Sequence, residues 1–373
     1  MQTRRHFLST VAAASAALAV SGLIGPLSAA ELEKTGVLTQ RPKTSGGKYR
    51  PPFRFGLGGA PIGNSVGVAV SDEEAETILE NAWNGGVRLY DTSPWYGLGL
   101  SERRFGALLH NKKREDYVLS TKIGRVLTAT SNPPKTAWAN PDSFDYRYDY
   151  TADATRRSVE DSLQRLGVSS IDIVYIHDLS PDNTDIADTW EQYFDQAARG
   201  AMPELTKMRE EGTIKGWGMG VNTLPPILKA LEVADPDIML AACQYSLIEH
   251  EESVNKLFPA CDKHGVSIMV GSPLNSGFLA GSARYNYSTK VPQKFIQKRD
   301  KLRRVCANHG VDLRTAALQF TAAPQSVSCV IPGARRPGQA KENIASMAVK
   351  IPSDFWNELK ETGLVAKNAP VPG

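Results

Sequence analysis

Few cysteines, little net charge and no basic cluster are the first features of this chain, and each absence removes a class of function. The 373 residues include four cysteines, none in a Cys-x-x-Cys spacing, so no zinc or other metal site is predicted. The formal net charge is +3 and no Lys/Arg run interleaves with aromatic residues, so nucleic acid is not an expected partner. The glycine-dense segment 55–63 does not read Gly-x-Gly-x-x-Gly, so it is not a Rossmann fingerprint.

The first 30 residues have the composition of an export signal. Arg4 and Arg5 precede Phe-Leu, an apolar alanine-rich stretch follows, and Ser28-Ala29-Ala30 offers a small-x-small cleavage site. The apolar stretch is short for a spanning helix, so a membrane anchor is the weaker alternative. We therefore expect a twin-arginine signal over 1–30, periplasmic or otherwise exported localisation, the twin-arginine export machinery as a partner, and no stable membrane association. Residues 31–52 are predicted to form an N-terminal tail.

From residue 53 to 350, short apolar strands alternate with amphipathic helices. Such near-continuous apolar strands are typical of parallel sheets buried on both faces. Eight strand–helix repeats predict an α/β fold with a single (β/α)8 TIM barrel, and an open doubly wound sheet is the alternative. Residues 351–373 are predicted to form a C-terminal helix and tail. The expected strands are 54–60, 87–93, 117–123, 171–177, 214–221, 238–246, 266–273 and 328–334.

Two segments interrupt this alternation. Residues 127–150 follow the third expected strand and carry one tryptophan, one phenylalanine and three tyrosines among prolines and polar residues. A long aromatic loop beside a catalytic rim predicts a lid or a wall of the substrate site, and a surface excursion packed on itself is the alternative. The segment 284–287, after the seventh strand, is a second rim candidate.

Four chemically distinct side chains fall at or just beyond the ends of consecutive strands: Asp91, Tyr96, Lys122 and His177. In a parallel barrel these strand ends form one rim, where catalytic residues collect. A nearby ammonium is expected to lower the pKa of a phenol, and a carboxylate holds the ammonium in place. The set predicts an enzyme that moves a proton at a carbonyl or an alcohol, with Tyr96 as general acid or base and His177 positioning the substrate oxygen. A glycosidase-type barrel is less well supported, because Asp91 and Asp178 are the only strand-end acids and Tyr96 and Lys122 would be unexplained.

The motifs around these residues resemble those of the aldo-keto reductase family. Asp91-Thr92-Ser93 through Tyr96-Gly97 is similar to the family's Asp-Thr-Ala-x-x-Tyr-Gly motif, and residues 163–177 are similar to its Leu-x-Arg-Leu-Gly signature that leads to a histidine. The resemblance implies a catalytic tetrad of Asp91, Tyr96, Lys122 and His177. It also implies an NAD(P)-dependent oxidoreductase that interconverts a carbonyl (aldehyde, ketone or sugar hemiacetal) and an alcohol or lactone.

The same resemblance implies a nicotinamide cofactor, NADP(H) or NAD(H), laid across the rim. Asn222 and Gln244 would hold the carboxamide, and Tyr245 would stack on the nicotinamide ring. The remaining residues would wrap the pyrophosphate (Ser272, Leu274 and Gly277) and hold the adenosine end (Gly333, Arg335, Gln339, Glu342 and Asn343). A helix N-terminus after the last group favours a negative charge there.

One departure from the family leaves the choice of cofactor open. Many members that require a 2′-phosphate carry lysine at the position of Gly333 and arginine at that of Gln339, and this chain lacks both charges. The whole pattern is similar to the branch that includes D-threo-aldose 1-dehydrogenases and pyridoxal dehydrogenases, which oxidise a cyclic hemiacetal to a lactone. A dinucleotide-binding redox sensor or partner subunit with little turnover is the alternative function.

Overall fold

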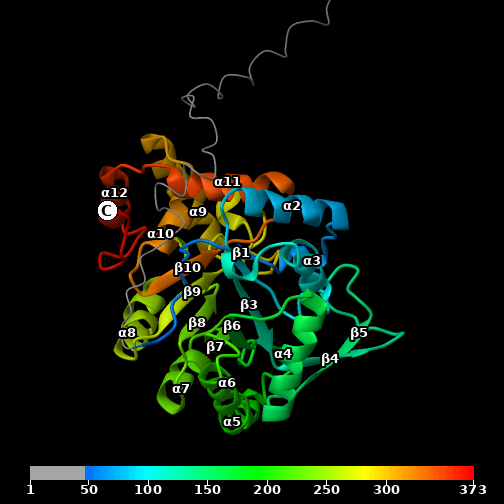
Figure 1. The fold of residues 1–373 in the computed structure, drawn as a ribbon. Helices are drawn as coiled ribbons and strands as arrows, with labels where there is room; N and C mark the ends of the chain where they lie inside the picture. Colours follow the sequence, from blue (N-terminus) through cyan, green and yellow to red (C-terminus); the bar gives the residue numbers. More distant parts are fainter. Residues whose placement is uncertain (1–46) are drawn as a thin grey trace, which may run out of the picture.

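Eight parallel strands form one barrel in the computed structural model, which describes residues 47–373 (Figure 1). Each strand pairs with the next along the chain, and backbone bonds join the first to the last: Gly56 N donates to the Val330 oxygen at 2.9 Å, and Val330 N donates to the Arg54 oxygen at 3.0 Å. The ring is therefore closed. The strands are β1 (Leu57–Gly58), β2 (Leu89–Asp91), β3 (Val118–Ile123), β6 (Ile173–His177), β7 (Gly216–Val221), β8 (Ile238–Ala242), β9 (Ser267–Gly271) and β10 (Val327–Ile331).

This closure confirms the predicted barrel and excludes the open-sheet alternative. Every residue of these eight strands is buried, as expected of strands covered by side chains within the barrel and by helices outside it. Each of the eight lies within, or within one residue of, an expected range, although β1 is much shorter than the range 54–60.

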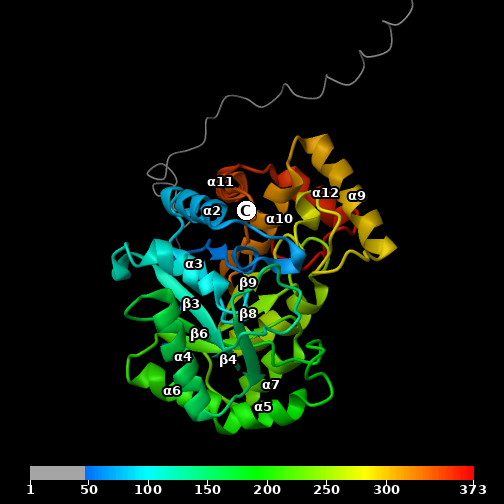
Figure 2. The same cartoon turned by 90° about the vertical axis from the view of Figure 1, so that its right-hand side faces the viewer.

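Helices surround the barrel (Figures 1 and 2). Capping fixes where several begin: Ser71 and Glu74 form a reciprocal capping box, and Thr151 caps the helix that follows it. The helices are α2 (Asp72–Asn84), α3 (Leu100–Leu109), α4 (Ala152–Leu166), α5 (Trp190–Arg199), α6 (Ala201–Glu210), α7 (Pro225–Val233), α8 (Phe258–Lys263), α9 (Gln293–His309), α10 (Leu313–Ala322), α11 (Pro337–Ala348) and α12 (Ser353–Glu361). Among the residues described, no helix is both long and apolar enough to cross a bilayer.

The aromatic segment after β3 is a hairpin rather than the expected loop. Strands β4 (Arg125–Ala129) and β5 (Phe144–Tyr148) pair antiparallel outside the barrel (Figure 1). Along β5, exposed Asp145 and Arg147 alternate with partly buried aromatic residues. This two-residue period places the aromatic rings on one face of the hairpin.

The start of the described chain covers the amino ends of the strands. Tyr49 and Phe53 pack against a buried cluster inside the barrel that includes Leu89 and Ile173. Tyr49 N also donates to Asp237 Oδ1 at 3.3 Å, just before β8. The expected export signal, residues 1–30, and most of the expected tail, 31–52, lie outside the described residues.

Candidate active site

Lys122 and Asp91 form a buried ion pair at the carboxyl rim of the barrel. Asp91 ends β2 and Lys122 lies in the adjacent β3, and the Lys122 Nζ lies 2.9 and 2.8 Å from the two carboxylate oxygens. It also donates to the Thr92 carbonyl oxygen at 2.7 Å. All the protons of the ammonium therefore have partners, as a charge buried at 1% exposure requires.

Tyr96 and His177 complete the cluster. The Lys122 Nζ lies 4.6 Å from the centroid of the Tyr96 ring, and the Tyr96 and His177 rings meet edge to face with centroids 5.6 Å apart. His177 ends β6, next to β3 in the barrel, while Tyr96 lies in the loop after β2. The structure thus brings together the four residues that the sequence placed at strand ends.

The electrostatics of Tyr96 differ from the expectation of a lowered pKa. Burial, and next the Asp91 carboxylate, raise the pKa of Tyr96 well above that of a free phenol. Asp91 holds the positive charge of Lys122, whose own pKa is lowered by burial against the opposing effect of that carboxylate. Tyr96 is therefore a neutral phenol at physiological pH, which suits it to donate a proton.

His177 is a neutral imidazole in this cluster. Burial lowers its pKa well below the usual value, and Lys122 and Arg125 lower it further. Its Nδ1 lies 3.0 Å from Ser93 Oγ, and its Nε2 lies 3.4 Å from Asp178 Oδ1. Sequence reasoning gave no catalytic part to Ser93 or Arg125, and it considered Asp178 only as a strand-end acid of the glycosidase alternative. All three lie within a few residues of a tetrad member.

Aromatic side chains of the hairpin and of its connecting loop pack against Tyr96 and Trp95. Trp138 lies 5.7 Å from the Tyr96 ring and 5.7 Å from the Trp95 ring, and Tyr146 of β5 lies 4.9 Å from the Trp95 ring. These contacts favour the predicted wall of the substrate site over an excursion packed only on itself.

A cavity of about 210 Å³ lies between this wall and the ends of β6 and β7. It combines an aromatic ring with hydrogen-bonding groups of every kind, namely carboxylates, amides, a hydroxyl and a guanidinium. Its lining residues are Trp95, Arg125, Asp178, Asp182, Asn183, Thr184, Asp185 and Asn222.

The two amides predicted to hold a nicotinamide carboxamide lie together. Gln244 Nε2 donates to the backbone oxygen of Asn222, and Asn222 Nδ2 donates to Asp182 Oδ2 at 3.2 Å. Ser272 follows β9 on the same rim, and its hydroxyl lies 3.1 Å from that of Tyr287. Gly277 has a φ of +84°, which suits glycine, at a tight turn that brings the backbone round beside buried Leu274.

The loop predicted to hold the adenosine end of the cofactor is cationic, and its own polar side chains fix its shape. The Arg335 pKa is lowered by burial and by two neighbouring guanidinium groups, those of Arg284 and Arg336. Gln339 Oε1 accepts from the backbone nitrogens of Arg335 at 2.8 Å and of Arg336 at 3.2 Å, so this side chain caps the loop. The cluster supplies positive charge at the start of α11.

Three neighbours of that loop have structural contacts. Asn343 Nδ2 donates to the Gly333 oxygen at 3.4 Å, and Glu342 pairs with Arg314. A Cβ added at Gly333 would lie 2.6 Å from Pro61 Cγ, so a larger residue there requires Pro61 to move. The absence of lysine at position 333 therefore has a packing reason as well as a consequence for charge.

Tyr245 does not have the predicted stacking role. Its ring is 1% exposed, parallel to Phe320 at 5.0 Å and edge-on to Phe258 at 4.8 Å. Cys243, with a φ of +63°, turns the chain just after β8, and Tyr245 points into the core rather than the rim. A ring packed in this way has no free face for a nicotinamide.

The fold and the four clustered side chains are typical of a barrel enzyme that transfers a proton at a carbonyl or alcohol. The Aldo/keto reductase family model matches residues 54–363, and the chain belongs to this family. It is an NAD(P)-dependent oxidoreductase that interconverts a carbonyl and an alcohol. The paired amides and the cationic loop fit the two ends of such a dinucleotide.

Among its relatives are two bacterial dehydrogenases. D-threo-aldose 1-dehydrogenase of a Pseudomonas species is 36% identical over 83% of this chain and 94% of its own. Pyridoxal 4-dehydrogenase of Microbacterium luteolum is 35% identical over 84% and 94%. The glycerol dehydrogenase structure from Gluconobacter oxydans has the same fold, with a TM-score of 0.64 at 22% identity over 90% of this chain and 98% of its own.

Proposed function

We propose that the protein oxidises the hemiacetal carbon of a cyclic sugar or pyridoxal-type substrate to a lactone. Two relatives, an aldose dehydrogenase and a pyridoxal dehydrogenase, act on substrates of this kind by name. The observation that carries the proposal is the polar cavity beside His177, with the Trp95 ring as one wall. Carboxylates and amides accept and donate to hydroxyl groups, while an aromatic ring packs against the C–H face of a sugar or a pyridine ring.

The tetrad supplies the proton chemistry of that oxidation. A bound oxidised nicotinamide would supply the acceptor for the hydride of the hemiacetal carbon. The hydroxyl proton passes to the Tyr96 phenolate, and the carbon–oxygen double bond of the lactone forms. Lys122 lies 4.6 Å from the Tyr96 ring and offers the phenolate a positive charge, and His177 donates to the reacting oxygen. In the reverse direction Tyr96 donates the proton as a phenol.

A substrate panel tests the proposal. We expect the purified chain to reduce NAD⁺ or NADP⁺ with free aldoses or with pyridoxal. The matched methyl glycosides should be inert, because their anomeric oxygen carries no proton. Turnover of simple aldehydes with NAD(P)H, and of no hemiacetal with NAD(P)⁺, would reject hemiacetal oxidation while leaving the family chemistry intact.

We also propose that the protein works after export by the twin-arginine route. Support comes from Arg4 and Arg5 before the apolar stretch and from the small residues near position 30. Replacing both arginines with lysine in a reporter fusion should abolish export, while Arg41→Lys in the expected tail should not. Unchanged export of the double variant would reject the route.

We infer that NAD(H) is accepted along with NADP(H). Position 333 cannot take a lysine without displacing Pro61, and Gln339 binds its own loop. The arginines at 335 and 336 supply the remaining positive charge for a 2′-phosphate. Titration with NADH and with NADPH, followed by tryptophan fluorescence, should give affinities within about tenfold of each other. A much larger preference for NADPH would reject this inference.

A further inference from the structure

Arg125 is a buried cation beside the tetrad. It is 4% exposed, and its guanidinium lies 4.4 Å from the Trp95 ring centroid and 5.0 Å from that of Tyr148. Its Nε donates to the Tyr148 hydroxyl at 3.2 Å, and its Nη1 donates to Asp178 Oδ2 at 3.0 Å. Burial of a guanidinium is unfavourable unless its charge is matched, and Asp178 supplies the matching negative charge.

Asp178 connects Arg125 to the catalytic histidine. One carboxylate oxygen binds Arg125, and the other, Oδ1, lies 3.4 Å from His177 Nε2. The residue has a φ of +45°, a conformation that L-residues other than glycine seldom adopt, and its backbone N donates to the Gly220 oxygen at 3.0 Å. A strained turn immediately after β6 therefore holds this carboxylate against His177.

The hydroxyl on the other side of the imidazole can supply a proton for Nδ1 to accept. Ser93 Oγ accepts from Trp95 N at 3.1 Å, so its own proton is free for His177 Nδ1 at 3.0 Å. When Nδ1 accepts from the serine, the proton of the neutral ring is on Nε2. That nitrogen is the one that faces Asp178 rather than Ser93.

The charges around His177 come from several elements. Lys122 of β3 and Arg125 of β4 are cationic, Asp178 and Asp91 are anionic, and Tyr96 is neutral. Lys122 is held by Asp91, and Arg125 is held by Asp178. Without Arg125, the partly buried Asp178 carboxylate would face His177 unpaired, and an unpaired anion beside an imidazole favours the imidazolium.

We propose that Arg125, Asp178 and Ser93 are positioning residues that keep His177 a neutral imidazole with its proton on Nε2. In that state His177 donates a hydrogen bond to the substrate oxygen in either direction of the reaction. Arg125 neutralises Asp178, so the carboxylate near Nε2 does not draw a second proton onto the ring, and the Nε2–H stays available for the substrate oxygen. The inference rests on the family's carbonyl chemistry, not on the hemiacetal substrate, so aldehyde reduction is enough to test it.

The test compares three variants by the pH profile of kcat/KM for aldehyde reduction. Arg125→Met leaves Asp178 unpaired, and we expect a new ionisation of His177 in the neutral pH range and at least a tenfold loss at the acidic end. Asp178→Asn removes the anion and should show no such ionisation. Combining the two changes should restore the shape of the wild-type profile, because no lone charge remains beside His177.

Two readings separate this role from a merely structural one. A folded Arg125→Met variant whose profile has the wild-type shape, or a double variant that keeps the new ionisation, would overturn the proposal. A second measurement uses the unaltered protein: nitrogen-15 spectra of labelled histidine, with His177 assigned by His177→Gln, should show the neutral Nε2–H tautomer between about pH 6 and about pH 8. A ring protonated on Nδ1, or on both nitrogens, would also overturn it. Dinucleotide affinity reports whether each variant is folded.

Discussion

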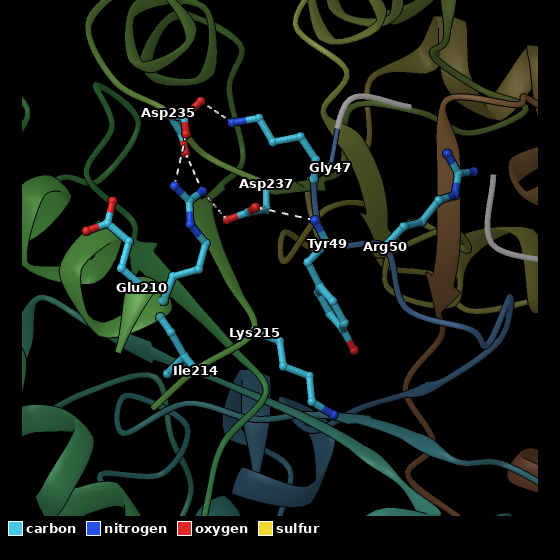
Figure 3. Close-up of a pocket in the computed structure, with 10 residues that line it drawn as sticks. Gly47, Tyr49, Arg50, Glu210, Ile214, Lys215, Asp235 and Asp237 are labelled. Carbon is cyan, nitrogen blue, oxygen red and sulfur yellow. Dashed lines mark hydrogen bonds and ion pairs between the residues drawn. The ribbon is translucent and has the colours of Figure 1, made fainter. Parts of the chain in front are cut away.

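The two ends of the barrel both carry buried charges, but they use them differently. At the amino end, the larger cavity, about 750 Å³, is lined by residues of the first described segment, of the end of α6 and of the loops before β7 and β8 (Figure 3). At the carboxyl rim, the cavity is about 210 Å³. A choice by cavity volume alone would place the active site at the amino end of the barrel, away from the tetrad.

At the amino end, charged side chains form ion pairs with side chains of opposite charge. Asp235 pairs with Lys48 and with Arg209 at 2.9 Å, and Arg209 also holds Asp237 at 2.9 Å (Figure 3). Asp237 accepts in addition from Trp217 N at 3.2 Å, so it ties β7 to the chain before β8. These carboxylates link elements of the barrel and stabilise the fold.

Charges at the rim surround groups with shifted pKa values that lie behind the residues lining the cavity, and His177 contacts one of these, Asp178. The pKa of Tyr96 is raised and that of His177 is lowered, in both cases chiefly by burial. Buried titratable groups with shifted pKa values next to a cavity are suited to catalysis, while matched ion pairs are suited to structure. The comparison therefore predicts that changes at the rim act on rate and that changes at the amino end act on stability.

The same substitution at both ends gives the largest expected contrast. Tyr96→Phe removes the proton donor, so we expect kcat to fall by about 10²- to 10⁴-fold with dinucleotide affinity retained. Tyr117→Phe, at the amino end of β3, should change kcat by less than about twofold. Steady-state kinetics and fluorescence titration measure both. Full activity of Tyr96→Phe would favour the alternative of a sensor with little need for turnover.

The converse change should act on stability. Asp172 precedes β6, and its carboxylate binds Arg114, Lys215 at 2.7 Å and the Leu119 backbone nitrogen at 2.8 Å. Asp172→Ala leaves these donors without their buried anion, so we expect the free energy of unfolding to fall by about 3–5 kcal/mol. Urea denaturation measures it.

The control and the activity assay complete that test. Asp300→Ala removes a half-exposed carboxylate on α9 and should cost less than about 1 kcal/mol. The remaining folded Asp172→Ala protein should have the wild-type kcat/KM. A loss of kcat without a loss of stability would show that charges at the amino end affect the reaction rate, and would contradict the comparison.

The sequence predicted the tetrad because strand ends can be read from a chain. Apolar runs mark the strands, and parallel strands closed into a barrel bring Asp91, Lys122 and His177 to one rim whatever the loops do. The hairpin also left a signal, since Phe144, Tyr146 and Tyr148 alternate with charged residues at a strand's period.

What could not be predicted depends on single backbone angles and on packing. Tyr245 follows Cys243, whose positive φ turns the chain and sends the ring into the core, and nothing in the local residue pattern announces that angle. The contact of Arg125 with Asp178 joins residues 53 positions apart through a strained turn. The pKa of Tyr96 is raised chiefly by its burial, which the residue types do not reveal. From the residue types alone, a lowered pKa was expected.

The pH dependence of the two directions sharpens the rim side of the comparison. A raised Tyr96 pKa means that the phenol stays protonated to higher pH than a free tyrosine. Reduction needs the phenol, so its kcat/KM should stay flat into the alkaline range. Oxidation needs the phenolate, so its kcat/KM should rise about tenfold per pH unit through neutrality. Profiles from about pH 6 to about pH 10 measure both. An oxidation profile already flat at neutral pH would show that Tyr96 is ionised there.

The smallest expected effect concerns the larger cavity itself. Lys48 and Lys215 line it and pair with Asp235 and Asp172, and one partner in each pair is largely exposed to solvent. Water screens such pairs, so Lys48→Met and Lys215→Met should each change the free energy of unfolding by less than about 1 kcal/mol. Neither should change kcat/KM, because the cavity lies at the opposite end of the strands from the tetrad. A tenfold change in kcat/KM from either substitution would mean that the amino end takes part in the reaction, and the division between the two ends would then be wrong.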